Sequence, residues 1–232
     1  MIKPISTGSK CLDEMMGGGL LKDGLTMIYG EPETGKTTLL MQCAANCAKQ
    51  NLKTLFIDCD DTFSPLRLKQ ITSEKFSQFA QLLLLIKPQS FSEQATIVDH
   101  LSDYITRSFG LVAIDTFNSL YRLSTSDDSL KTFELSRELN RQMANLSQIS
   151  KEKQIPIVLT SQVKSVLDNP NQSIAPVAHR VLKFWAKKTI ALTLTENPQI
   201  IEASLEDNHN TQEASCYLRI AEIGIRDYDF PY

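Results

Sequence analysis

The sequence contains no apolar run that approaches the roughly 18–20 residues needed for a membrane-spanning helix. Its first ten residues, MIKPISTGSK, also lack the apolar core of a secretory signal. Five cysteines are present, but none lies in a CxxC pair or a Cys/His cluster, which argues against a zinc site. The odd number predicts free thiols in a reducing compartment, so we expect a cytoplasmic protein that makes no membrane contact.

An excess of positive charge is also missing. Lys and Arg together number 24 against 27 Asp and Glu, which gives a formal net charge of −3. This excludes a globally basic nucleic-acid binder, so any DNA-binding surface must be a local patch. No repeat, low-complexity tract or linker divides the 232 residues, and 42% of them are apolar. The sequence therefore predicts a single domain over residues 1–232 with a sizeable core.

Apolar runs alternate with segments of helical periodicity, which predicts an α/β fold. We expect a mostly parallel twisted sheet with helices on both faces and antiparallel C-terminal strands at one edge. Ligands bind such sheets at the carboxyl ends of the strands. Strands are expected at residues 25–29, 54–58, 82–86, 111–115, 155–161, 189–195, 200–205 and 215–223, and helices at 36–50, 92–109, 135–153 and 177–186.

A phosphate-binding loop lies between the first expected strand and helix. The segment GEPETGKT, residues 30–37, matches the GxxxxGKT pattern, in which backbone N–H groups and a helix N-terminus surround phosphates. Lys36 is expected to reach the β and γ phosphates of ATP, and the Thr37 hydroxyl to bind Mg²⁺. The expected nucleotide-binding residues are Gly30, Glu31, Pro32, Glu33, Thr34, Gly35, Lys36, Thr37 and Thr38.

Acidic residues follow two other expected strands. Asp115 closes the apolar run LVAI and is the expected acidic partner of Thr37 at the Mg²⁺ site. Asp60 and Asp61 come directly after the strand at residues 54–58, where a carboxylate can activate the attacking water. We assign that catalytic role to Asp60. The alternative is that Asp58, Asp60 and Asp61 form a solvated acidic turn.

Taken in order, these segments resemble the RecA/RadA recombinase superfamily over nearly the whole chain. The resemblance is carried by STGSK (6–10), LDE (12–14), GGGL (17–20), FIDCDDTFSPLRL (56–68), LTSQV (159–163) and RIAEIGIRD (219–227). It implies a RecA-like P-loop NTPase core that uses ATP and Mg²⁺ in DNA repair and homologous recombination. It further implies that Gln162 senses the γ-phosphate and that Arg67 stacks on adenine. Asp60 stands where the family has a water-activating glutamate, and Asp61 where it has a glycine.

The sequence differs from the family's recombinases in ways that indicate a particular subgroup of the family. The family's recombinases carry an N-terminal DNA-binding domain and a Phe-x-x-Ala polymerisation motif, and the sequence contains no Phe-x-x-Ala tetrad. It therefore resembles the archaeal RadB-like paralogs that consist of the core alone. This implies an accessory protein or mediator that hydrolyses ATP slowly, binds single-stranded DNA and acts on a full-length RadA-type recombinase or on other repair or replication proteins. Two alternatives remain: an active strand-exchange recombinase, and a KaiC-like signalling ATPase that does not bind DNA.

The same resemblance locates two DNA loops, at about 118–131 and about 163–178. Tyr121 could stack on a base at the first loop. The candidate phosphate-binding residues in or near the loops are Arg122, Lys164, Arg180 and Lys183. One alternative is that Lys183, Lys187 and Lys188 form a solvated helix end next to the edge strand, where lysines also guard an exposed edge. The other is that lysines in this region reach the nucleotide of a neighbouring subunit.

Overall fold

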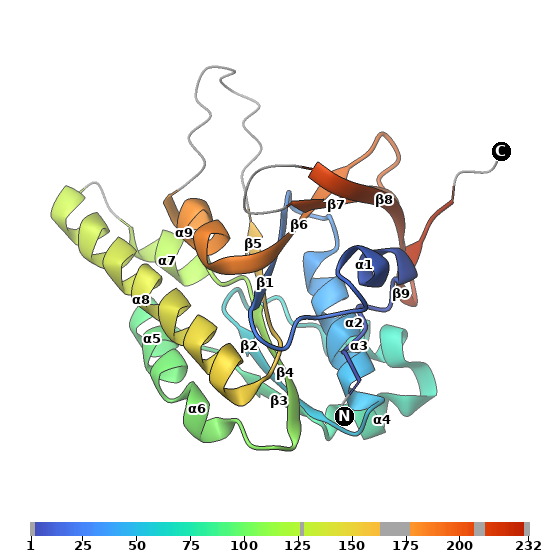
Figure 1. Ribbon diagram of the computed structural model, residues 1–232, viewed down its shortest axis with the longest axis horizontal. Coiled ribbons are helices and arrows are strands. Elements are labelled where there is room, and N and C mark those ends of the chain that lie inside the picture. Colours follow the sequence, from blue (N-terminus) through green and yellow to red (C-terminus); the bar gives the residue numbers. More distant parts are fainter. Residues whose placement is uncertain (1–2, 126–127, 163–176, 207–211, 230–232) are drawn as a thin grey trace.

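A computed structural model of the protein describes residues 3–125, 128–162, 177–206 and 212–229. Within these ranges the strands form one sheet in the order β3-β2-β4-β5-β1-β6-β7-β8-β9 (Figure 1). The strands from β3 to β6 in this order pair in parallel, and β7, β8 and β9 continue the sheet antiparallel. This confirms the predicted fold class. The strands are β1 (Leu25–Gly30), β2 (Lys53–Asp58), β3 (Leu83–Ile86), β4 (Phe109–Asp115), β5 (Ile157–Gln162), β6 (Ala186–Leu194), β7 (Ile200–Glu206), β8 (Gln212–Ala221) and β9 (Gly224–Asp227).

Helices cover both faces of the sheet, as Figure 1 shows. Side chains alternate between the faces along each strand, so Met27 of β1 belongs to one apolar cluster and Ile28 to the other. The first cluster packs α5 to α9 against the sheet, and the second packs α1, α2 and α3. The helices are α1 (Lys10–Met15), α2 (Lys36–Ala48), α3 (Pro65–Thr72), α4 (Phe76–Ala80), α5 (Phe91–Asp99), α6 (Leu101–Tyr104), α7 (Ser119–Ser124), α8 (Ser129–Lys153) and α9 (Val177–Trp185), with a short 3₁₀ turn at Ser73–Lys75.

Two expectations about local structure are wrong. The helix expected over 92–109 is broken at His100 into α5 and α6, and the chain then runs into β4. The first DNA loop, expected at 118–131, contains α7 and the beginning of α8. Tyr121 is only 4% exposed and its ring packs edge-on against Phe91, so it cannot stack on a base in this structure. Most of the second loop lies outside the described residues.

The two ends of the described chain are joined to each other. The backbone N–H of Lys10 donates to the Asp227 carboxylate at 2.9 Å, and the Ser9 hydroxyl bonds to the same group. Cys11 of α1 forms a disulfide with Cys216 of β8. The prediction of five free thiols is therefore wrong for this pair, because a separation of 205 residues leaves no spacing signal in the sequence. Cys43, Cys47 and Cys59 are free and buried.

We find no helix in the described part of the chain that is long and apolar enough to cross a membrane.

Candidate nucleotide-binding site

The GEPETGKT segment connects the end of β1 to the start of α2, as the sequence predicts. Two of its glycines are required by geometry. A Cβ at Gly30 would lie 2.2 Å from the carbonyl oxygen of Leu192, and Gly35 has a φ of +79°, which a side chain rarely tolerates. The loop wraps around the first turn of α2, whose leading N–H groups have no partners within the helix. A loop of this shape is an anion-binding site at a helix N-terminus.

Lys36 lies inside the loop. Its ammonium donates to the carbonyl oxygen of Gly30 at 3.0 Å and to that of Glu31 at 2.5 Å. Burial lowers the pKa of Lys36 to about 8, although Asp115, Asp60 and Glu31 oppose the change. The Thr34 hydroxyl, at 3.3 Å, is its third partner. A cation that has lost hydration and is held by neutral oxygens is well suited to exchange them for phosphate oxygens.

Asp115 lies beside the loop at the end of β4. The pairing of the strands puts it level with Asp58 of β2, and the hydroxyl of Thr160 on β5 bonds to its carboxylate. Burial raises the pKa of Asp115 above its ordinary value, although hydrogen bonds from Thr160 and Thr37 oppose the change. A hydroxyl and a carboxylate oxygen in contact fit the hard-oxygen ligands that Mg²⁺ requires.

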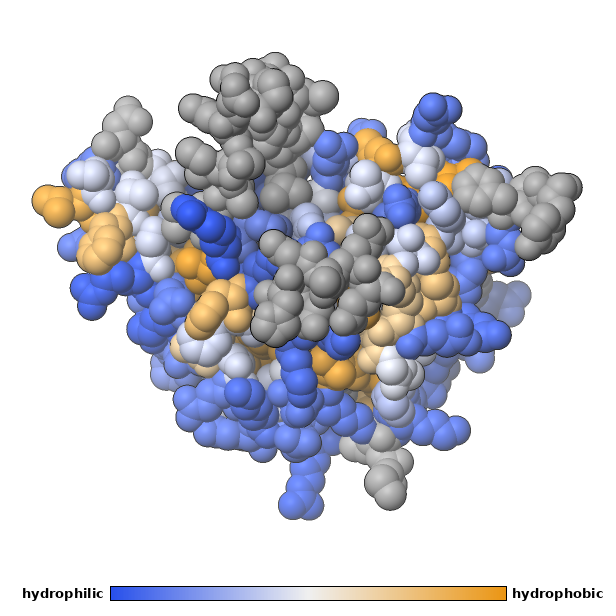
Figure 2. All heavy atoms as spheres, turned by 45° about the horizontal axis from the view of Figure 1, so that its top comes forward, coloured by the Kyte–Doolittle hydropathy of each residue, from blue (hydrophilic) through white to orange (hydrophobic). Residues whose placement is uncertain are grey.

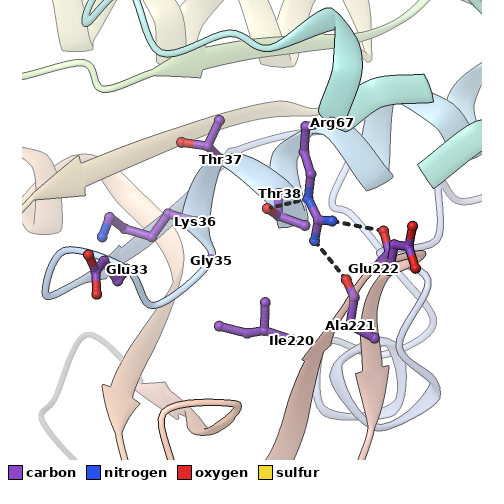
Figure 3. Close-up of a pocket in the computed structure, with 9 residues that line it drawn as sticks. All are labelled: Glu33, Gly35, Lys36, Thr37, Thr38, Arg67, Ile220, Ala221 and Glu222. Carbon is purple, nitrogen blue, oxygen red and sulfur yellow. Dashed lines mark hydrogen bonds between the residues drawn. The ribbon is translucent and has the colours of Figure 1, made fainter. Parts of the chain in front are cut away.

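Next to the loop is a cavity of about 510 Å³ (Figure 3). Arg67 of α3 borders it and joins three elements. Its guanidinium donates to the carbonyl oxygens of Ala221 at the end of β8 and of Glu222 in the turn that follows, both at 2.8 Å, and to the Thr38 hydroxyl at 3.3 Å. Arg67, the residue expected to stack on adenine, therefore lies at the cavity. Its guanidinium group is fixed in position by hydrogen bonds to two backbone carbonyl oxygens. The residues that line the cavity are Glu33, Gly35, Lys36, Thr37, Thr38, Arg67, Ile220, Ala221 and Glu222.

Asp60 and Gln162 lie on the other side of the loop. Asp60 is exposed, and its carboxylate accepts a hydrogen bond of 2.5 Å from Ser119 in α7. It borders a separate cavity of about 220 Å³ and is close enough to Lys36 to influence the pKa of that residue. Gln162 ends β5 directly beside Gly30, and its side-chain oxygen lies 3.5 Å from the Arg122 guanidinium. Strand order thus brings both expected catalytic residues to the same edge as the loop.

The acidic turn after β2 contains three carboxylates with different surroundings. Asp58 is buried and accepts hydrogen bonds from the backbone N–H groups of Thr62 and Phe63. Asp61 has a φ of +52° and pairs with Lys87 at 2.5 Å. The positive φ explains why a glycine fits this position in the family that the sequence resembles. Lys87, Ser119 and Thr160 are site residues that sequence reasoning missed. Lys87 and Ser119 belong to no recognisable motif, and Thr160 lies in the LTSQV segment, in which only Gln162 was given a role.

The candidate DNA-binding residues that the structure describes differ in their surroundings. Arg122 and Arg180 are exposed, whereas Lys183 forms an ion pair with Glu206 at 2.7 Å. Lys164 lies outside the described residues. Figure 2 shows apolar side chains protruding at the far left, over the first turns of α8, where Leu130 is 76% and Phe133 62% exposed. The expectation of DNA contacts from these four basic residues stays a prediction.

Comparison with known proteins agrees with this geometry. Residues 1–228 match the Rad51 family model. A DNA repair and recombination protein RadB from Thermococcus onnurineus is 31% identical over 227 residues, covering 96% of this chain and 97% of that relative. RadB from Methanococcoides burtonii is 31% identical over 219 residues, or 94% of this chain and 95% of the relative.

A solved structure, described as the crystal structure of the RadB recombinase, superposes with a TM-score of 0.81 at 30% identity. The match covers 97% of this chain and all of the other. The order of the strands, the phosphate-binding loop and these similarities lead to one conclusion. The chain belongs to the Rad51 family of the RecA/RadA superfamily, and within it the chain is RadB-like.

Proposed function

We propose that this protein is an ATP-binding accessory factor of homologous recombination, which hydrolyses ATP slowly, binds single-stranded DNA and acts on a RadA-type recombinase. One observation carries the proposal. Lys36 and Thr37 lie close to Asp115 at the carboxyl ends of the parallel strands, beside a cavity of about 510 Å³ that Arg67 borders. This arrangement supplies a cation, a pair of oxygen ligands and a planar stacking group for the phosphates, the metal ion and the base of one nucleotide.

The chemistry follows from the side chains. Lys36 would exchange its carbonyl partners for β- and γ-phosphate oxygens, and Thr37 with Asp115 would hold Mg²⁺. The metal ion, when bound, neutralises charge on the phosphates. Asp60 would accept the proton of the attacking water, and Ser119 fixes the orientation of its carboxylate through their hydrogen bond. Gln162 would contact the γ-phosphate through an uncharged amide.

The contact between Gln162 and Arg122 supports a link between nucleotide and DNA. Gln162 is the last described residue before the expected second DNA loop, and Arg122 lies in the expected first loop. A nucleotide that draws the Gln162 amide towards its γ-phosphate would release the Arg122 guanidinium. The freed cation would then be available for a DNA phosphate.

The sheet supports the proposed partner. β3 is the edge strand on one side of the described sheet, and Leu84 in it is 44% exposed. An exposed apolar edge can accept an added strand from another protein. The sequence has no Phe-x-x-Ala donor of its own. We therefore infer that this edge takes the Phe-x-x-Ala segment of a full-length recombinase.

A fluorescence titration with labelled oligothymidine, with and without ATP and Mg²⁺, tests the DNA part. We expect ATP to strengthen binding and Arg122→Ala to remove that gain, while the matched variant Arg226→Ala, which removes an exposed arginine of β9, leaves it unchanged. Absence of oligonucleotide binding in every nucleotide state would favour the KaiC-like signalling ATPase. Strand exchange by the protein without any recombinase would favour the active recombinase.

A further inference from the structure

A second hollow, of about 820 Å³, lies at the opposite end of the sheet. It is lined where β4 begins, at Phe109, and just before β5, at Ile155. In Figure 1 the end of α8, the turn between α6 and β4 and the segment before β1 come together here, on the lower side of the sheet. β4 alone separates this hollow from Asp115 by about 20 Å, at roughly 3.3 Å per residue. The hollow is therefore distinct from the nucleotide site.

The side chains that line this hollow are mostly basic at its rim and apolar in its interior. Arg107, Lys153 and Lys22 line the hollow together with a single carboxylate, Glu152, and the Lys53 ammonium lies 6.0 Å from the centre of the Phe109 ring. Arg107 and Lys153 are exposed and form no ion pair with any described residue. Ile105 and Ile155 are buried and form the apolar part of the wall.

The carboxylates nearest to these basic residues in the sequence, Glu152 and Asp23, already form hydrogen bonds or ion pairs with other side chains. Glu152 accepts a hydrogen bond of 2.7 Å from Gln148, and Asp23, next to Lys22 in sequence, is paired with Lys187 at 2.8 Å. In a chain with a net charge of −3, this leaves a local excess of positive charge around a concave surface. Its volume falls within the range of about 300–1,000 Å³ that ligand pockets occupy.

We propose that this basic hollow binds an acidic peptide segment of a partner protein, with carboxylates on Arg107 and Lys153 and an apolar side chain against Phe109. Arg107 offers a planar fork that matches a carboxylate, and Lys153 adds a point charge beside it. The apolar floor distinguishes this occupant from nucleic acid. A phosphate backbone needs an extended track of cations, whereas here the cations surround one hollow with an aliphatic wall.

The test uses a fluorescein-labelled peptide of Asp and Leu in a two-to-one ratio, with a peptide of Asn and Leu as its uncharged match. Fluorescence anisotropy is measured on the full-length protein. We expect the acidic peptide to bind, more weakly as salt rises, and the Asn peptide not to bind. Arg107→Glu with Lys153→Glu should weaken binding at least tenfold, and Arg107→Gln with Lys153→Gln should give a smaller loss. Lys69→Glu with Lys75→Glu, which reverses two exposed charges elsewhere, should change nothing.

Nucleotide binding and thermal unfolding of the same variants are measured in parallel, and both should match wild type. The proposal is overturned if the acidic peptide does not bind wild type, or binds Arg107→Glu/Lys153→Glu with unchanged affinity. It is also overturned if oligothymidine competes for the hollow and binds it more tightly than the peptide does. None of these outcomes depends on whether ATP or a recombinase is bound at the other end of the sheet.

Discussion

At the residue scale, the two carboxylates that follow β2 differ in what they contact. Asp60 bonds to Ser119 and lies close enough to Lys36 of the phosphate-binding loop to act on its pKa, whereas Asp61 pairs with Lys87 in a left-handed turn. The family resemblance predicts the first as the catalytic position and the second as a former glycine. The sequence could not predict Ser119, because it lies 59 residues away and meets Asp60 only after the strands have paired.

We predict that Asp60→Glu increases the rate of ATP hydrolysis by about tenfold or more. Aspartate holds its carboxylate one methylene nearer the backbone than glutamate, and a misplacement of about 1 Å can cost roughly 10²-fold in rate. Steady-state phosphate release measures the change. Asp60→Asn should be slower than wild type with nearly unchanged ATP affinity, and Asp61→Asn serves as the matched control. Hydrolysis by Asp60→Asn at the wild-type rate would show that Asp60 is only part of an acidic turn.

At the element scale, the strands and helices with a strong hydrophobic pattern could be predicted from the sequence, whereas the breaks between elements and the shortest strand could not. The apolar runs at residues 25–29, 54–58 and 111–115 become β1, β2 and β4 within one or two residues. The helical spacing of Ile97, Leu101 and Ile105 is satisfied by two helices and a turn, because Ile97 is half-buried before the break at His100, and Leu101 and Ile105 are buried after it. β9 was missed because a four-residue strand has no periodicity to detect.

α9 is attached to the sheet through a polar cluster that the sequence pattern did not suggest. Glu206 at the end of β7 accepts hydrogen bonds from Lys183 of α9 and from Tyr29 of β1, at 2.7 and 2.6 Å. Tyr29 directly precedes Gly30, and His179 of α9 packs edge-on against its ring. Burial raises the pKa of Glu206, but the bonds from Lys183 and Tyr29 outweigh it, so the pKa lies below its usual value.

We predict that Glu206→Ala lowers the free energy of unfolding by about 1.5 kcal/mol at neutral pH, the low end for hydrogen bonds to a charged group that is still partly solvated. Because the pKa is depressed in the folded state, this stabilisation exists above pH 4.5, the ordinary pKa of the group, and is lost as the pH falls further. Urea unfolding at pH 7 and pH 3.5 measures it. Glu202→Ala, on the same strand, is the control, and an equal effect of both variants would contradict the account.

At the scale of the whole molecule, α1, the first helix of the chain, is bonded to β8 and β9, its last two strands. Asp227 of β9 caps α1, and the Cys11–Cys216 disulfide joins α1 to β8. β8 and the turn that leads from it to β9 also supply Ile220, Ala221 and Glu222 to the rim of the nucleotide cavity. Closure of the chain thus contributes to the shape of the site. This could not be predicted from the sequence, which showed only five unrelated cysteines.

We predict that the protein unfolded in guanidinium without reductant exposes three thiols to a thiol reagent, and five after reduction. Closing a loop of about two hundred residues stabilises a fold by up to about 5 kcal/mol, so dithiothreitol should lower the melting temperature. Cys11→Ser should expose four thiols and melt at the same temperature with or without reductant. Five thiols in the unreduced wild type would contradict the disulfide.

The central claim is that the segment from Gly30 to Thr38 binds ATP and Mg²⁺ through Lys36. A titration of wild type and Lys36→Ala with a fluorescent ATP analogue in the presence of Mg²⁺ tests it most directly. Lys49→Ala, which removes an exposed lysine from the other end of α2, is the matched control. The account predicts tight, Mg²⁺-dependent binding to wild type and Lys49→Ala, and at least a hundredfold loss in Lys36→Ala with an unchanged melting temperature. Equal affinity of Lys36→Ala and wild type for the nucleotide would contradict it.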